Sequence, residues 1–265
     1  MIALPAAGNA LVHGVFMALA ILAGLSVFAW ELRRRRFADD RLWVIAGVSL
    51  ALGAVASRLG TWFQDLDVTR NASLLEWWSG GNRSVLAGLV GAWAGVLLGK
   101  RITGYPTSTG DLFAPAVALS MAVGRIGCLL TELPGRPTGG AWGIVLSPEQ
   151  AAALGGVPGA GLHPSFAYEI VFQALAFAWL WRNRDRLARP GDLFICYVAG
   201  YALFRFAVEF VRANDEVWFG LTRPQWFLML TLPLLGWRVR RVLQPPRPAP
   251  TPSQTAAGDL TRSTP

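Results

Sequence analysis

The chain has 265 residues, of which 53% are hydrophobic and only 15% carry a formal charge, and its net charge is +8 at pH 7. Soluble globular domains contain about 25% charged residues, so this composition excludes an ordinary soluble domain. Two cysteines and two histidines exclude a disulfide framework and a multi-histidine metal site, and we expect neither a metal nor a cofactor.

Seven apolar segments follow one another along the chain and predict an all-α integral membrane protein with seven transmembrane helices. Only the first segment has about 20 residues free of formal charge, the length that a spanning helix needs. Several others reach that length only by including a charged residue such as Arg58, Arg125 or Glu169. The segments lie at residues 10–31, 42–63, 84–99, 111–131, 163–181, 192–211 and 225–237.

Basic residues alternate between the two ends of these segments. Cytoplasmic loops of membrane proteins are enriched in lysine and arginine, so the alternation places the N-terminus outside and the C-terminus in the cytoplasm. It also accounts for the positive net charge without a nucleic-acid partner. The predicted cytoplasmic side holds fourteen basic residues, Arg33, Arg34, Arg35, Arg36, Arg41, Lys100, Arg101, Arg182, Arg184, Arg186, Arg189, Arg238, Arg240 and Arg241, and the other side holds five, Arg70, Arg83, Arg136, Arg212 and Arg223.

The chain divides into one membrane domain, residues 1–243, and a tail, residues 244–265. Prolines among threonines and serines dominate the tail, which predicts a disordered cytoplasmic segment. Within the long connection 133–162, Ser147 can cap a short helix that begins at Pro148 and ends at Gly155. Asp111 is positioned to cap the fourth membrane helix.

Arg125 lies between Gly124 and Gly127 at a depth where the bilayer is expected, and Glu132 follows seven residues later. An arginine at the bilayer centre costs about 2.5–3.5 kcal/mol on insertion scales, so it must face a cavity, a partner or a bound anion. A buried carboxylate that holds it for packing is one interpretation. We favour an anion-binding arginine, because ionisable groups inside a membrane are functional by default.

Tyr201, Arg205, Glu209 and Arg212 form one polar stripe on the sixth segment, at spacings of i, i+4, i+8 and i+11. Arg205 and Glu209 can neutralise each other as an i,i+4 pair. A second membrane arginine beside Arg125 instead favours a phosphate ligand, because the planar guanidinium group matches two phosphate oxygens at once. We therefore expect both arginines to approach one phosphate.

His163 opens the fifth segment, followed by Pro164, Tyr168 and Glu169. A histidine at a helix start is either a hydrogen-bonded cap or a proton acceptor, and both interpretations stay open. Arg58 adds a further charge in the second segment.

In this order the motifs resemble those of the bacterial prolipoprotein diacylglyceryl transferase family. That family has a Gly-Arg-x-Gly-Asn signature that ends in Gly-Arg-Pro-Thr, a His-Pro-x-x-x-Tyr-Glu motif, and a Tyr-x-x-x-Arg-Phe-x-x-Glu-Phe-x-Arg motif. Here they read as residues 124–127 with 135–138, residues 163–169, and residues 201–212. The resemblance covers residues 10–240.

The resemblance implies a multi-pass protein of the bacterial inner membrane that transfers diacylglycerol from phosphatidylglycerol to a cysteine thiol. That thiol belongs to the lipobox of a prolipoprotein signal peptide, so the expected partners are phosphatidylglycerol, this peptide and membrane lipids. The implied catalytic residues are Arg125, Arg205, Glu132 and His163, and the two arginines would bind substrate together with Arg58, Tyr168, Tyr201, Glu209 and Arg136.

The chain departs from the family pattern at three places. Cys128 stands where the family has asparagine, no histidine follows Gly80-Gly81, and His13 lies near the position of a family tyrosine. The thiol proton could pass to His163, His13 or Glu132, or the arginines alone could favour the thiolate. A phospholipid-binding protein without catalysis and a transferase with another acceptor remain alternatives, and Cys128 is interpreted as a small apolar residue.

Overall fold

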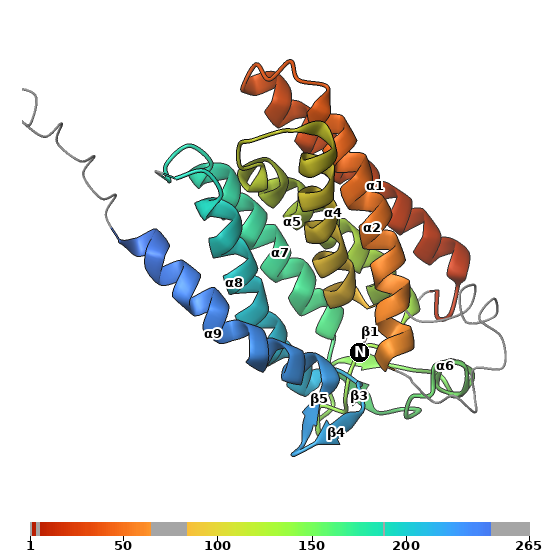
Figure 1. Cartoon of the computed structure of the whole chain (residues 1–265). Helices are drawn as coiled ribbons and strands as arrows, with labels where there is room; N and C mark the ends of the chain where they lie inside the picture. The colour runs from red at the N-terminus through yellow and green to blue at the C-terminus, as the bar shows by residue number, and fades with distance from the viewer. Residues whose placement is uncertain (1, 4–5, 65–83, 188, 245–265) are drawn as a thin grey trace, which may run out of the picture.

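The computed structural model describes residues 2–3, 6–64, 84–187 and 189–244, and it is a bundle of long helices with short strands at one end (Figure 1). Every predicted apolar segment forms a helix. The predictions about the residues after Gly80-Gly81 and about the tail beyond residue 244 lie outside the described residues. The long helices are α1 (Ala10–Arg34), α2 (Arg41–Gln64), α4 (Val85–Thr103), α5 (Gly110–Thr131), α7 (Ser165–Asn183), α8 (Asp192–Val208) and α9 (Arg223–Leu243).

Five of the described helices, α1, α2, α4, α5 and α8, are long and apolar enough to cross a membrane. Glu169 and Gln173 lower the mean hydropathy of α7, and a run of arginines lowers that of α9. Large apolar side chains such as Leu11, Leu175 and Leu230 are exposed on the bundle, as expected for helices that face lipid rather than water. The fold is therefore that of an all-α, multi-pass membrane protein.

Helix α5 lies at the centre of the bundle and contacts α1, α7 and α8. More of its length is buried than that of the other four candidate spans. Phe28 of α1 stacks on Phe113 of α5, with 4.8 Å between ring centroids, within an apolar core shared with α2. Because α5 carries Arg125 on this buried surface, its position decides which side chains surround that arginine.

Asp111 does not cap its own helix, so that prediction is wrong. Thr109 precedes α5 and makes no side-chain cap hydrogen bond. The Asp111 carboxylate instead accepts hydrogen bonds from the backbone N–H groups of Gly191, at 2.7 Å, and Phe194, at 3.3 Å. These two groups belong to the first turn of α8, so Asp111 of α5 caps the neighbouring helix and fixes the two helices in register.

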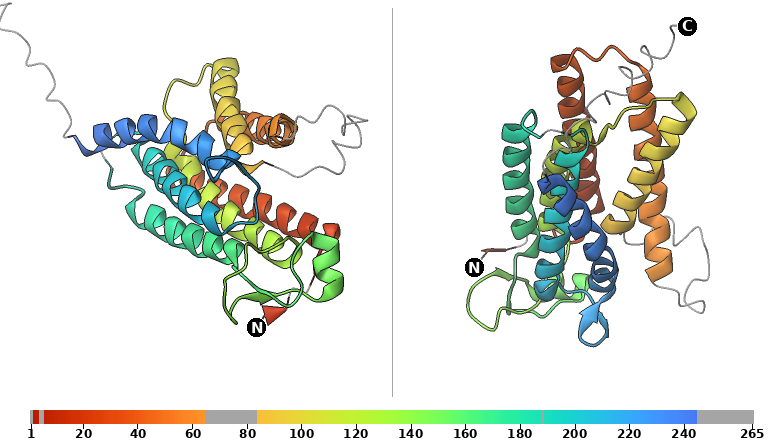
Figure 2. Two further views of the ribbon diagram at one scale, coloured as in Figure 1. Left: turned by 90° about the horizontal axis from the view of Figure 1, so that it is seen from below. Right: turned by 60° about the vertical axis from the view of Figure 1, so that its left-hand side comes forward.

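Helices α2 and α4 pack against each other through a row of glycines, and they stand beside the remaining helices (Figures 1 and 2). Gly91, Gly95 and Gly99 of α4 are buried at spacings of four residues. A Cβ atom at Gly95 would lie 2.6 Å from the Cα atom of Ser49, closer than two carbon atoms can approach. The two backbones are thus in direct contact, as in other small-residue interfaces between membrane helices.

We expect Gly95→Val to separate α2 from α4 and to lower the free energy of unfolding by about 1–3 kcal/mol, the usual cost of overpacking. The measurement is denaturant unfolding in detergent micelles. Gly47→Val is the matched control, because a Cβ atom at Gly47 of α2 would meet nothing within 4 Å. Equal losses for the two variants would contradict the close contact at Gly95.

The short strands lie at the end of the bundle where α5 and α8 finish and α7 begins (Figure 1). In one sheet, β2 (Ile144–Val145) pairs with β1 (Ile2–Ala3) in parallel and with β3 (Gly161–Leu162) in antiparallel fashion. In the other, β4 (Glu216–Trp218) pairs antiparallel with β5 (Leu221–Thr222). Between β2 and β3 lies α6 (Pro148–Leu154), which begins with the predicted Ser147 cap and ends at Gly155, so that prediction is confirmed.

Candidate active site

The charged residues predicted to lie within the membrane meet where α5, α7 and the end of α8 come together. Arg125 of α5 pairs with Glu169 of α7, with 2.6 Å between Nε and Oε2. The other oxygen of the same carboxylate, Oε1, accepts a hydrogen bond of 2.7 Å from Arg212 Nη1. Glu169 is fully buried and Arg125 is 6% exposed. One carboxylate therefore joins two arginines from different parts of the chain.

A second carboxylate, Glu209, binds the remaining arginine of this cluster. It follows α8 in a short 3₁₀ turn, Glu209–Val211, and pairs with Arg205 one helical turn earlier. Its Oε1 atom also accepts hydrogen bonds from Asn214 Nδ2, at 2.6 Å, and from Thr222 Oγ1, at 2.8 Å. Arg212 Nε lies 3.8 Å from Glu209 Oε2, so Arg212 links the two carboxylates.

The cluster holds three arginines, Arg125, Arg205 and Arg212, against two carboxylates, Glu169 and Glu209. With all five groups ionised, one positive charge remains uncompensated in a region that excludes water. Such a charge is costly unless it is paired. The cluster therefore has the charge balance of a site that binds a monoanion.

Three buried donors of the cluster lack a hydrogen-bond partner among the described residues, Arg205 Nε, Arg212 Nε and the Tyr201 hydroxyl. The acceptor Glu169 Oε2 also lacks a hydrogen bond, although it forms an ion pair with Arg125. Tyr201 is 3% exposed. Buried polar groups are nearly always hydrogen-bonded, so unpaired donors in a charged site indicate a place for a ligand or a water. All three donors are able to donate a hydrogen bond to an anion, which agrees with the surplus positive charge of the cluster.

The structure brings together four of the residues predicted for the site, Arg125, Arg205, Tyr201 and Glu209, around the Glu169 carboxylate. The charges of both Arg125 and Arg205 act on Glu169 and on Tyr201. Both arginines thus act on the same two side chains, and their approach to one phosphate stays a prediction. The alternative interpretation, in which a carboxylate neutralises each arginine, is also met: Arg125 pairs with Glu169, and Arg205 pairs with Glu209.

Arg58 and Arg136 lie apart from this cluster. Arg58 is half-buried on α2, the helix that packs against α4. Arg136 pairs with Glu216 of β4, with 2.6 Å between Nη1 and Oε1, and donates to the backbone carbonyls of Arg212, at 3.0 Å, and Asn214, at 3.2 Å. Arg136 thus braces the segment that carries Arg212 into the cluster.

His163 and Tyr168 contact each other at the start of α7, with 3.3 Å between Nδ1 and the hydroxyl oxygen. The His163 ring also packs edge-on against Trp142, with 5.0 Å between centroids, and its backbone N–H donates to the Arg136 carbonyl. These contacts hold His163 in the loop layer that covers the end of the bundle.

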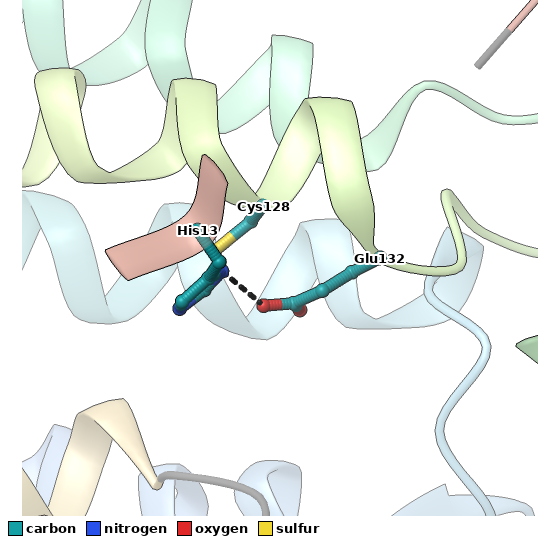
Figure 3. A group of neighbouring side chains, drawn as sticks. All are labelled: His13, Cys128 and Glu132. Carbon is teal, nitrogen blue, oxygen red and sulfur yellow. Dashed lines mark ion pairs between the residues drawn. The ribbon is translucent and has the colours of Figure 1, made fainter. Parts of the chain in front are cut away.

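Glu132, at the end of α5, lies against His13 of α1, with 3.4 Å between Oε1 and Nδ1 (Figure 3). Cys128, one turn earlier on α5, points toward the same two side chains (Figure 3). Arg125 Nη1 lies 3.8 Å from Cys128 Sγ, so this group adjoins the arginine cluster.

Sequence reasoning assigned no role to Glu169 and Arg212, although both belong to the quoted motifs. Arg212 is the last member of the polar stripe, and its spacing of eleven residues from Tyr201 indicated the shared face. Glu169 carried a weaker signal, since an acidic residue inside an apolar helix needs a cationic partner. No pattern along the chain indicated that this partner would be Arg125.

Comparison with known proteins places these residues in a family. Residues 6–238 match the family model described as prolipoprotein diacylglyceryl transferase. A protein of Dehalococcoides mccartyi is 29% identical over 240 residues, which cover 86% of this chain and 89% of the relative. Relatives from Ruegeria pomeroyi, 30% identical with 88% of each chain covered, and Cereibacter sphaeroides, 34% identical with 75% of each covered, are also similar.

All three relatives bear the name phosphatidylglycerol–prolipoprotein diacylglyceryl transferase. The matched region contains α1 through most of α9 and so includes the whole arginine cluster. The chain therefore belongs to the prolipoprotein diacylglyceryl transferase family.

Proposed function

We propose that this protein transfers the diacylglyceryl group of phosphatidylglycerol to the cysteine thiol of a prolipoprotein. The family and the names of the relatives support this activity. The observation in the structure that carries it is the buried cluster of three arginines and two carboxylates, with one surplus positive charge and unpaired donors on Arg205 and Arg212. Phosphatidylglycerol presents a phosphodiester with a single negative charge, which balances this surplus.

The reaction is a displacement at the glyceryl carbon that carries the phosphate. The thiolate sulfur forms a bond to this carbon, the carbon–oxygen bond breaks, and glycerol phosphate leaves with the electron pair. Negative charge grows on the leaving phosphate, and guanidinium groups already in place stabilise it without rearranging. Arg125, Arg205 and Arg212 would share this task, with Glu169 and Glu209 fixing their orientation.

The acceptor thiol must lose its proton, because the thiolate is the nucleophile. His163 and Tyr168 contact each other and the loop layer. Glu132 follows Arg125 by seven residues, about two turns along α5, and pairs with His13. We therefore place the acceptor thiol beside His13 and Glu132. From that position the sulfur approaches a phospholipid whose phosphate lies on Arg125.

The decisive experiment follows labelled phosphatidylglycerol in the presence of purified protein and a lipobox peptide. We expect label from the diacylglyceryl group to appear on the peptide and glycerol phosphate to be released in equal amount. A protein that binds the phospholipid but releases no glycerol phosphate would be a non-catalytic member of the family. Complementation of a bacterial strain depleted of its own transferase tests the same activity in cells.

We further propose that all seven long helices cross the bacterial inner membrane, with the N-terminus outside. The ends rich in arginine contact one another: Arg35 donates to the Arg184 carbonyl at 3.3 Å, which joins α1 to α7. Arg189 donates to the Arg241 carbonyl at 2.9 Å, which joins the start of α8 to the end of α9. This is the arrangement expected if these basic ends share the cytoplasmic face.

A reporter that is active only in the periplasm tests this orientation. Fused after Gly156, in the connection between α6 and β3, it should give a strong signal. Fused after Gln244, beyond α9, it should give none. The reverse pattern would place the arginine cluster near the cytoplasmic leaflet and would contradict the proposed orientation.

A further inference from the structure

His13, Cys128 and Glu132 bring three kinds of metal-binding atom to one place. A nitrogen of His13, the Cys128 sulfur and a Glu132 oxygen all lie within 4.8 Å of one another. Cys128 is buried, whereas the side chains of His13 and Glu132 are 24% and 43% exposed. Figure 3 shows the three side chains converging from two helices. The group thus has a buried base and a side that remains accessible.

The helix geometry holds these atoms together. Cys128 and Glu132 are four residues apart on α5 and so share one face of that helix. His13 reaches them because α1 passes close to α5 at Gly127, where a Cβ atom would lie 2.8 Å from the Cβ atom of Phe16. Thr131 Oγ1 lies 3.4 Å from His13 Nδ1 and contacts the Gly127 carbonyl at 2.8 Å. The approach of the two helices therefore fixes the distance between the side chains.

We propose that His13, Cys128 and Glu132 bind a zinc ion and leave its fourth coordination position open. Zinc takes nitrogen, sulfur and oxygen ligands in tetrahedral geometry, and its catalytic sites keep three protein ligands. Zinc–nitrogen and zinc–oxygen bonds of about 2.0–2.1 Å place those two ligand atoms about 3.3–3.4 Å apart in a tetrahedron. In the structure His13 Nδ1 and Glu132 Oε1 lie 3.4 Å apart. The Cys128 sulfur lies within 4.8 Å of these two atoms and would have to come within about 3.6 Å of them, the separation that a zinc–sulfur bond of about 2.3 Å sets in a tetrahedron.

The charges also suit a divalent ion. A thiolate on Cys128 and the Glu132 carboxylate together carry two negative charges, which neutralise Zn²⁺. Arg125 Nη1 lies 3.8 Å from Cys128 Sγ and would face a neutral metal site rather than a dication. The phosphate-binding arginine and the metal would thus both lie beside the Cys128 sulfur atom.

The open position gives the metal a role that rests on the proposed function. A thiol that coordinates zinc is deprotonated outright, so the acceptor cysteine would bind there as a thiolate. Its sulfur then forms a bond to the glyceryl carbon, the carbon–oxygen bond breaks, and the phosphate on Arg125 takes the electron pair. Overall, one thiol and one phosphatidylglycerol anion give a thioether, the glycerol phosphate dianion and one proton. His13 and Cys128, both departures from the family pattern, then act in the same step.

Metal content tests the site independently of activity. Full-length protein purified in detergent from zinc-supplemented cells should hold about one zinc per chain. Cys128→Ser and His13→Ala should each weaken zinc binding at least tenfold. Cys196→Ser is the matched control, because Cys196 lies in α8 and is not part of the group. Thermal unfolding of each variant shows whether a loss of metal reflects a loss of fold.

Cobalt provides the second readout. Co²⁺ in the site should show thiolate-to-metal charge-transfer absorption, which should disappear in Cys128→Ser and grow when a lipobox peptide adds its own thiolate. No growth with the cysteine peptide, or equal growth with a peptide whose cysteine is replaced by serine, would overturn the open position.

These experiments distinguish a failure of the zinc proposal from a failure of the proposed function. Wild-type protein that binds zinc but transfers no diacylglyceryl group would contradict the proposed function and leave the site intact. Wild-type protein that holds no zinc, or that transfers at full rate after chelation, would overturn the metal proposal. Loss of transfer in His13→Ala but not in Cys128→Ser would also overturn it, and would identify His13 as a proton acceptor instead.

Discussion

Arg125→Lys should abolish most of the transfer activity while the protein remains folded and inserted. Lysine keeps the positive charge, so a role based on charge alone would survive the substitution. The arginine side chain, however, pairs with Glu169 through Nε while its planar group presents further N–H donors, whereas an ammonium group is a single point charge. Losing one well-placed donor to a developing negative charge costs about 2.7–4 kcal/mol, or roughly 10²–10³ in rate.

The measurement compares diacylglyceryl transfer from labelled phosphatidylglycerol to a lipobox peptide at equal amounts of inserted protein. Arg101→Lys is the matched control, since Arg101 is exposed in the last turn of α4, away from the cluster. It should transfer at the wild-type rate. A near-normal rate for Arg125→Lys would show that Arg125 acts only through its charge, and the donor geometry argued above would be wrong.

The positions of the helices were predictable because the bilayer imposes a simple requirement on each of them. A spanning segment must be apolar over a fixed length, and this pattern can be read along the chain one residue at a time. The short helix α6 was predictable for a similar reason, since its signals at Ser147, Pro148 and Gly155 are local. Asp111 shows the limit: its carboxylate caps α8, and no local pattern distinguishes a cap on the same helix from one on a neighbour.

The pairing of charges was only half predictable. The pair of Arg205 with Glu209 follows from helical spacing, and the presence of Arg125 in lipid requires a partner. Helix α8 ends at Val208, so helical spacing does not place Arg212. Which carboxylate pairs with which arginine depends on how α5, α7 and α8 pack, and the spacing of residues along the chain does not predict this packing. Arg205 therefore keeps its predicted partner Glu209, four residues later along the chain, whereas Arg125 pairs with Glu169 from another helix.

The group of His13, Cys128 and Glu132 could not be found from sequence spacing. Metal motifs are recognised when their ligands recur at short, regular intervals. Here Cys128 and Glu132 supply such an interval on α5, but His13 belongs to the first helix of the chain. Only the close contact between α1 and α5 at Gly127 brings the histidine to the other two residues.

Glu169→Gln should destabilise the protein more than any other single change in the cluster. Glu169 is fully buried and pairs with both Arg125 and Arg212, so its removal leaves three arginines with the single carboxylate of Glu209. Removing one partner of a buried ion pair costs about 3–5 kcal/mol, because the remaining charge stays out of water without compensation. We expect a loss of this size in the free energy of unfolding, measured by denaturant titration in detergent micelles.

A control variant and a double variant show whether the loss of stability in Glu169→Gln comes from lost charge or from lost packing. Glu149→Gln makes the same chemical change on the exposed surface of α6 and should leave stability within about 0.5 kcal/mol of wild type. Adding Arg212→Gln to Glu169→Gln removes one of the uncompensated charges, so the double variant should recover part of the lost stability. If the double variant is instead less stable than Glu169→Gln by the full cost of the second substitution, the two residues act independently, and Glu169 does not serve as the shared counter-charge of the arginine cluster.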